Sequence, residues 1–164
     1  MSWSILKFSG EEIIEIALQM EESGILFYQK ALTIAKENKL KDTLIYLAQE
    51  EEKHIQAFNQ LGEQLKYHFV PNERYVGEYG DYIKSLVNSH IFKLTEVEDL
   101  IKEIKNDQDI LRFAIGFEKD SIAIFQEFKN VANKAGADIL EQLINEEKGH
   151  IKAISAFLHS MVSQ

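Results

Sequence analysis

The stretch LAQEEEKHIQAF, which spans residues 47–58, decides the fold class of this chain. Leu47, Glu51, His54 and Phe58 follow one another at steps of three or four residues, the spacing of one face of an α-helix. This face is apolar apart from Glu51 and His54. Because the period continues in both directions, the sequence predicts a helix over about residues 41–66 with a carboxylate and an imidazole on its core-facing side.

Three further segments have the same helical period, at about residues 11–38, 108–134 and 138–162. Each has one glutamate on its otherwise apolar face. The connections near Lys39 and near Gly136 are only a few residues long. Short connections make neighbouring helices antiparallel, so two helical hairpins are predicted. The core-facing glutamates of these three helices are Glu21, Glu118 and Glu147.

The stretch between the hairpins, residues 67–107, is too long for a turn between adjacent helices. It contains the chain's single proline and two short helical patterns, at about residues 79–89 and 95–104. Such a stretch has to travel the length of the bundle, so the third long helix starts far from the end of the second. We therefore expect an all-α single domain over residues 1–164: a four-helix bundle of two antiparallel hairpins joined by one long crossover that contains short helices.

The composition excludes several classes of protein. The chain has 164 residues, no cysteine and a formal net charge of −9 from 18 basic and 27 acidic side chains. The lack of cysteine excludes disulfides, thiolate metal sites and cysteine nucleophiles, and the acidic balance argues against a nucleic-acid partner. No apolar run approaches the roughly 20 residues of a membrane span, and residues 1–8 lack the pattern of a signal peptide. We therefore expect a cytoplasmic protein with no membrane or nucleic-acid partner.

The two hairpins repeat one another in sequence. The alignment of residues 20–31 with residues 117–128 pairs the glutamate of the first helix with that of the third. Alignment of the second helix with the fourth pairs their Glu-x-x-His motifs, Glu51–His54 and Glu147–His150. The two alignments differ in spacing by a single residue, which the turn of a hairpin absorbs. We interpret this pattern as an internal duplication.

One core-facing glutamate on each helix indicates a shared cause. A bare buried carboxylate is costly or takes up a proton, whereas bound cations offset its charge. Four carboxylates and two imidazoles offer oxygen and nitrogen ligands without sulfur, a set that suits Fe or Mn. In the alternative interpretation the glutamates are paired or face solvent, and the chain is a metal-free helical interaction module. The predicted metal ligands are Glu21, Glu51, His54, Glu118, Glu147 and His150.

Four short motifs resemble those of ferritin-like di-iron carboxylate proteins, in particular the rubrerythrin-like family. The resemblance covers all four long helices but not the crossover. The motifs are E-x-x-G-x-x-F-Y at residues 21–28, L-A-x-E-E-x-x-H at residues 47–54, E-x-x-S-x-x-I-F at residues 118–125 and E-E-x-x-H at residues 146–150.

This resemblance implies a di-iron site with a separate role for each ligand. Glu21 and Glu118 look like terminal ligands, whereas Glu51 and Glu147 look like ligands that bridge the two metals. Each histidine would complete one metal. Rubrerythrins typically add a glutamate one turn beyond the third-helix ligand, where this chain has Ser121. The remaining set of six ligands is closer to the symmetric sites of bacterioferritins.

The resemblance also implies a function. It predicts a non-haem di-iron oxidoreductase that reduces hydrogen peroxide or O₂ at a carboxylate-bridged diferrous site and protects against oxidative stress. Electrons would come from an external donor protein, because the chain has no cysteine for a rubredoxin domain. The alternative is a ferroxidase or iron-handling ferritin-like protein with Fe(II) as its substrate. Two Fe ions are expected, with Mn possible in their place, and we expect a small homo-oligomer, a dimer.

Tyr28 and Gly24 lie on the same helix as Glu21, near the predicted site. The hydroxyl of Tyr28 either hydrogen-bonds a ligand carboxylate, acts as a redox-active phenol, or belongs to an ordinary core aromatic. Gly24 either leaves room beside the metals for O₂ or peroxide or allows two helices to pack closely. Glu50, Glu52 and Glu146 flank the predicted ligands, and we expect them to form a solvated face, the alternative being that they hydrogen-bond a ligand side chain.

Overall fold

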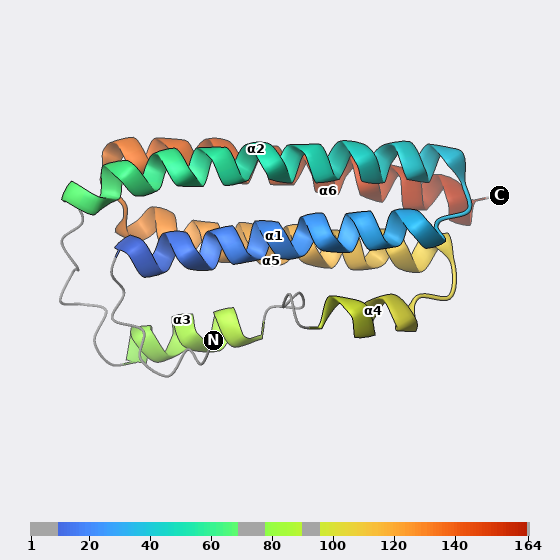
Figure 1. Cartoon of the computed structure of the whole chain (residues 1–164), viewed down its shortest axis with the longest axis horizontal. Coiled ribbons are helices and arrows are strands. Elements are labelled where there is room, and N and C mark those ends of the chain that lie inside the picture. Colours follow the sequence, from blue (N-terminus) through green and yellow to red (C-terminus); the bar gives the residue numbers. More distant parts are fainter. Residues whose placement is uncertain (1–9, 69–77, 90–95, 164) are drawn as a thin grey trace.

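The computed structural model describes residues 10–68, 78–89 and 96–163, and within these ranges it contains helices and no strand (Figure 1). The predicted all-α fold is therefore confirmed. None of the helices in the described part of the chain combines the length and the hydropathy that a membrane crossing requires. The helices are α1 (Gly10–Ile34), α2 (Asn38–His68), α3 (Glu78–Asn88), α4 (Val97–Glu103), α5 (Asp107–Val131) and α6 (Lys134–Val162).

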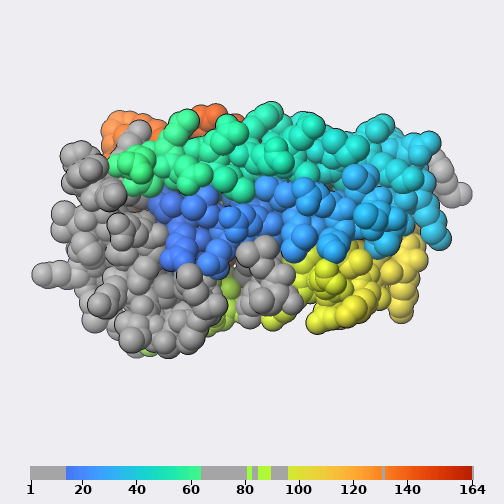
Figure 2. Space-filling model, in the orientation of Figure 1, coloured from blue at the N-terminus to red at the C-terminus, as the bar shows by residue number. Residues whose placement is uncertain are grey.

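The four long helices form a bundle of two antiparallel hairpins, α1 with α2 and α5 with α6 (Figure 1). Helix α2 ends at one end of the bundle and α5 begins at the other, so the crossover runs back along the whole molecule, as the length of that stretch predicts. The short helices α3 and α4 lie along this path, α3 against α5 and α4 against α1. Figure 2 shows α1 between α2 and α4, so the crossover covers a second side of this helix.

The first hairpin turns earlier than the sequence pattern indicates. Residues 35–37 form the turn, whereas the connection was expected near Lys39, which lies in α2. The cause is a contact from the other hairpin, because the carboxylate of Asp107 accepts hydrogen bonds from the backbone N–H of Lys36 at 3.0 Å and of Glu37 at 2.8 Å. This cap belongs to α5, and the periodicity of α1 and α2 contains no sign of it.

The second hairpin also turns before the expected position. Helix α6 begins at Lys134 with Asn133 as its N-cap, so Gly136 lies in the first helical turn rather than in the connection. The side chain of Asn133 accepts a hydrogen bond from the Gly136 N–H at 2.8 Å, which satisfies one of the free donors at the helix start. Asparagine is among the preferred N-cap residues, so the cap itself explains the earlier start.

The crossover helices lie close to their expected positions. Helix α3 covers Glu78–Asn88 against the expected residues 79–89, and α4 starts at Val97 with Glu96 at its N-cap position. The expected start of α4 at residue 95 lies outside the described residues, as do residues 69–77 and 90–95 of the crossover.

The apolar core is divided into two clusters along the bundle. In α1, Met20 belongs to the first cluster and Phe27 to the second, and Glu21 lies between them. A glutamate separates the two clusters in each of the other long helices as well, and the clusters follow in the reverse order along the antiparallel helices α2 and α5. The fold therefore places one polar layer across the middle of an otherwise apolar core.

Candidate metal centre

The four core-facing glutamates are fully buried in the middle of the bundle. Each has an exposed fraction of 0 %, and the two histidines that follow at i+3 are 1 % and 4 % exposed. Each helix contributes one carboxylate, and α2 and α6 each add one imidazole, because side chains three residues apart share a helix face. The structure thus brings together all six residues that the sequence analysis singled out, which are Glu21, Glu51, His54, Glu118, Glu147 and His150.

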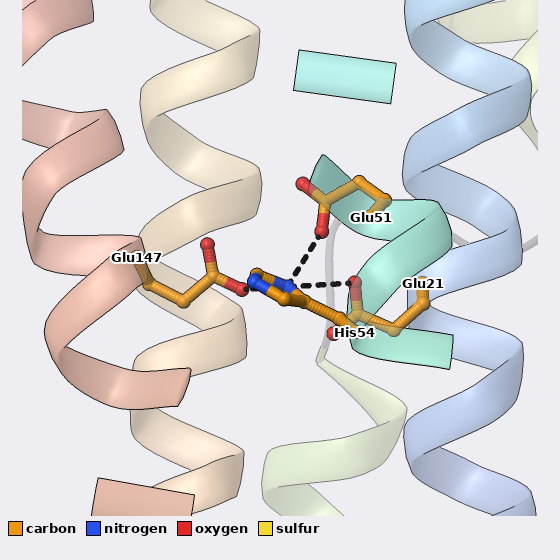
Figure 3. A group of neighbouring side chains, drawn as sticks. All are labelled: Glu21, Glu51, His54 and Glu147. Atoms are coloured by element: carbon orange, nitrogen blue, oxygen red, sulfur yellow. Dashed lines mark ion pairs between the residues drawn. The ribbon is translucent and has the colours of Figure 1, made fainter. Parts of the chain in front are cut away.

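The ring of His54 lies among three carboxylates from three different helices (Figure 3). Its Nδ1 atom is 3.0 Å from an oxygen of Glu51, 3.2 Å from an oxygen of Glu147 and 3.6 Å from an oxygen of Glu21. One N–H group cannot point at three acceptors, so hydrogen bonding alone does not explain this convergence.

His150 has a similar place in the other half of the cluster. Its Nδ1 atom lies 3.0 Å from an oxygen of Glu147 and 3.6 Å from an oxygen of Glu118. The two imidazole rings stack at a centroid distance of 5.9 Å. The second half therefore repeats the first, as the internal duplication predicts.

The ligand atoms fall into two groups that share two residues. Within each group, one atom from each of four residues lies within 4.8 Å of the others. The shared residues are Glu51 and Glu147, so they are the two that contact both groups. We call the first group the His54 position and the second the His150 position. The His54 position consists of Glu21, Glu51, His54 and Glu147, and the His150 position of Glu51, Glu118, Glu147 and His150.

The cluster has the chemistry of a metal-binding site. Both oxygens of Glu21 and of Glu51, one oxygen each of Glu118 and Glu147, and Nδ1 of His54 are buried without a hydrogen-bond partner. Buried polar atoms in folded proteins are nearly always paired, so seven such atoms in one layer require another partner. Anionic oxygens and imidazole nitrogens are the ligands that iron and manganese prefer. The residues present therefore fit a pair of divalent cations.

The protonation of the cluster agrees with this fit. Burial raises the pKa of Glu118 to about 8 and that of Glu51 well above its usual value. Burial opposes the charged form of His150, but the nearby carboxylates of Glu118 and Glu147 outweigh this effect and raise its pKa to about 10. The pKa of His54 is raised for the same reason. Protons on the histidines thus supply positive charge that bound cations would otherwise provide.

The model of the Rubrerythrin family matches residues 12–104, more than half of the chain. The chain belongs to the rubrerythrin family. Rubrerythrins typically bind iron, and the buried cluster could hold a metal. The matched range contains Glu21, Glu51 and His54, whereas the other three residues of the cluster lie beyond it and join the site through the repeat of the hairpin. No curated protein and no solved structure matched the chain in the same comparisons.

Tyr28 contacts the cluster of this rubrerythrin domain directly. Its hydroxyl donates a 2.8 Å hydrogen bond to Glu118 across the bundle, and the side chain is fully buried. Burial and the charge of Glu118 raise the pKa of Tyr28 well above its usual value, so the phenol is neutral and acts as a donor. Of the three roles left open by the sequence, the structure shows the hydrogen bond to a carboxylate of the cluster.

Two small residues beside the cluster have different surroundings. A Cβ atom at Gly24 would lie 2.6 Å from Cε1 of Phe117, so the ring of Phe117 fills the space that one of the two alternatives assigned to O₂ or peroxide. Gly24 therefore serves the packing of α1 against α5. Ser121, at the position of the additional rubrerythrin glutamate, is fully buried, and its hydroxyl has no hydrogen-bond partner.

Glu146 has the alternative place that the sequence analysis left open, in contact with a histidine of the cluster. A solvated face was the first expectation for it, but its carboxylate accepts a 3.1 Å hydrogen bond from Nε2 of His54. A groove of about 420 Å³ between α2 and α6 is lined by both residues and by Glu50. Because this bond joins the two hairpins, the spacing along α6 alone could not reveal it.

Proposed function

We propose that this chain is a non-haem di-iron oxidoreductase that reduces hydrogen peroxide or O₂ with electrons from an external donor. The observation that supports the proposal is the buried layer of four carboxylates and two histidines, in which seven ligand atoms have no hydrogen-bond partner. Membership of the rubrerythrin family, whose members typically bind iron, supports the same assignment.

Two iron ions, with manganese as the possible substitute, would be held by the six residues of the cluster. Glu51 and Glu147 belong to both groups and are the candidates for bridging ligands. Glu21 with His54 would complete the first position, and Glu118 with His150 the second. The chemistry that such an iron pair supplies is the two-electron reduction of H₂O₂ to two waters, with two protons taken up, or the reduction of O₂.

The protein would contribute charge, position and exclusion of water. The anionic oxygens of the four glutamates favour the higher charge of oxidised iron. Tyr28 holds Glu118 in place by its hydrogen bond, and the apolar clusters on both sides limit the access of solvent. No thiolate electron carrier can form within these 164 residues, because they contain no cysteine, so the electrons would come from another molecule.

The proposal is tested by reconstitution with Fe(II) under anaerobic conditions. We expect two iron ions per chain, oxidation on addition of H₂O₂ or O₂, and renewed oxidation after chemical reduction. The variant Glu147→Ala removes a residue shared by both positions and should lose most of the bound iron and of the oxidation. A wild-type protein that binds two irons but shows no oxidation by either oxidant contradicts the proposal.

A second candidate function is ferroxidase activity, in which Fe(II) is the substrate. The groove between α2 and α6 favours it, because Glu50 and Glu146 line an opening that reaches the ring of His54. The two functions differ in the fate of the metal. A ferroxidase releases ferric iron and takes up more Fe(II) over many turnovers, whereas the proposed oxidoreductase keeps two irons per chain throughout its cycle.

A further inference from the structure

The two halves of the metal centre differ in the side chains behind their histidines. The internal repeat pairs Glu146 with Glu50, since each immediately precedes the glutamate of a Glu-x-x-His motif. Eight residues before its histidine, α6 has Gln142, whereas α2 has Tyr46. One residue before its histidine, α6 has Gly149, and α2 has a lysine. The residues at all these positions are exposed or half-buried, whereas the carboxylate layer is fully buried.

Behind His54 the side chains form a continuous hydrogen-bonded chain. Nε2 of His54 lies 3.1 Å from one oxygen of Glu146, and the other oxygen of Glu146 accepts a 3.0 Å hydrogen bond from the amide of Gln142. Both carboxylate oxygens of Glu146 are therefore in use, and its orientation toward the histidine is fixed.

Behind His150 the arrangement is different. The ring of Tyr46 lies edge-on to the imidazole, with a centroid distance of 6.0 Å and an interplanar angle of 88°. Glu50, the counterpart of Glu146, instead forms an ion pair with Lys53 on its own helix. Within the described part of the chain, His150 forms its hydrogen bond to a carboxylate on its inner side, from Nδ1 to Glu147, and Glu118 lies 3.6 Å from the same atom.

We propose that Glu146 is a positioning residue that acts through His54 and makes the two metal positions inequivalent. A carboxylate accepts hydrogen bonds, so Glu146 keeps a proton on Nε2 of His54 and leaves the lone pair of Nδ1 directed at the carboxylate layer. It also fixes the plane of the ring. The His54 position therefore has a histidine that is held from behind by a carboxylate, and the His150 position does not.

The physical consequence is a difference in metal affinity. Carboxylates that hold a metal-bound histidine raise its basicity and orient it, and their loss typically lowers metal affinity about 10- to 100-fold. We therefore expect the loss of Glu146 to lower the metal affinity of one of the two binding steps, and the loss of Glu50 to lower neither. This inference rests on the metal site of the proposed function. The experiment below distinguishes a failure of this inference from a failure of the proposed function.

The test is an anaerobic Fe(II) titration of the full chain, with Glu50→Ala as the matched control for Glu146→Ala. The wild type should bind two ions. Glu146→Ala should weaken one binding step about 10- to 100-fold and leave the other unchanged, and Glu50→Ala should resemble the wild type. Glu146→Gln keeps an acceptor oxygen and should recover part of the lost affinity. Thermal unfolding without metal verifies that each variant folds.

A second variant disturbs the hydrogen bond between Glu146 and His54 without changing either residue. Gly149→Lys places a lysine three residues after Glu146, in the relation that Lys53 has to Glu50, and nothing lies within 4 Å of the Cβ that it adds. An ion pair in this relation withdraws Glu146 from His54. The same single binding step should therefore weaken, although the carboxylate is still present.

A spectroscopic signature distinguishes positioning from a merely structural role. In protein loaded with Zn(II), a diamagnetic probe, the Nε2-bound proton of His54 should be shifted downfield and protected from exchange with water in the wild type and in Glu50→Ala. It should lose both properties in Glu146→Ala. Equal effects of the two alanine variants, or no effect of Glu146→Ala in a wild type that binds two ions, would overturn this inference alone. A wild type that binds no Fe(II) would overturn the proposed function and this inference together.

Discussion

At the scale of single residues, the site is a set of side chains that are poorly satisfied in the absence of a cation. The polar layer contains seven ligand atoms without partners, and the hydroxyl of Ser121 is also buried and unpaired. Unpaired buried polar groups lower the stability of a folded protein. The metal-free protein therefore retains side chains that oppose its own stability, a pattern typical of functional sites.

Removal of the unpaired hydroxyl should stabilise the metal-free protein. Ser121→Ala deletes a buried oxygen with no partner and is expected to raise the free energy of unfolding by about 1 kcal/mol. Ser23→Ala is the matched control, because that hydroxyl is also buried but donates a 2.7 Å hydrogen bond to the carbonyl of Gln19. Urea denaturation of both variants measures the difference. A gain of equal size in both would contradict the argument.

Removal of the Tyr28 hydroxyl should have the opposite effect and destabilise the metal-free protein. Tyr28→Phe leaves an oxygen of Glu118 without its 2.8 Å donor in a fully buried environment, so the free energy of unfolding of the metal-free protein should fall by about 1–3 kcal/mol. Tyr46→Phe, at a tyrosine with an exposed fraction of 49 %, should change it little. Denaturant unfolding of the two variants tests this. A free energy of unfolding that is unchanged in Tyr28→Phe would mean that the hydrogen bond does not contribute to stability.

At the scale of helices, contacts between the hairpins decide where elements end and how closely they approach. The carboxylate of Asp107 at the start of α5 caps the turn between α1 and α2. Phe117 of α5 fills the notch that Gly24 leaves in α1. Each contact joins residues that are far apart in the sequence, so each one fixes the relative position of the two halves of the site.

The cap formed by Asp107 should contribute measurably to stability. Asp107→Ala leaves the N–H groups of Lys36 and Glu37 without an acceptor in a part-buried turn, which should lower the free energy of unfolding by about 1–3 kcal/mol. Asp138→Ala is the control, because that aspartate forms only an exposed ion pair with Lys134. Equal denaturation midpoints for the two variants would contradict the assigned role.

Two of the helical glycines, Gly24 and Gly149, should respond differently to the same substitution. Gly24→Ala forces a methyl group against the buried ring of Phe117, and overpacking of this kind costs about 1–3 kcal/mol. Gly149→Ala adds a methyl group with nothing within 4 Å, so the helix propensity of alanine should stabilise the protein by about 0.5–1 kcal/mol. The unfolding temperature should therefore fall in Gly24→Ala and rise in Gly149→Ala. A rise in both variants would show that Gly24 is not a packing position.

These elements show which features a single sequence can predict. The helical period predicts the four long helices, because a buried stripe leaves a direct mark on the sequence, and it puts Glu21 and Glu51 on inward faces. The turn at residues 35–37 and the bond from Glu146 to His54 depend on contacts between hairpins. Such contacts are set by how the helices pack against one another, and no local pattern records them.

At the scale of the whole molecule, the polar layer joins both hairpins. Each of the two groups of candidate ligands draws its residues from three helices, and both groups contain Glu51 from the first hairpin and Glu147 from the second. The family match ends at residue 104, so half of the ligand set lies outside the matched range. A bound metal pair would therefore add a further link between two hairpins that already meet through apolar packing and through hydrogen bonds such as that of Tyr28 to Glu118.

Metal binding should consequently stabilise the whole bundle. A ligand that binds only the folded state and is present at 100 times its dissociation constant adds about 2.7 kcal/mol to the free energy of unfolding. Anaerobic Fe(II) should raise the unfolding temperature in a single cooperative transition, and a chelator should reverse the rise. Glu51→Gln keeps the side-chain volume, and because burial raises the pKa of Glu51 well above its usual value, a neutral amide should change the metal-free stability little. The same variant should lose most of the Fe(II)-dependent rise, since it weakens a ligand of both positions. An unchanged rise in Glu51→Gln would show that the metal binds elsewhere on the chain.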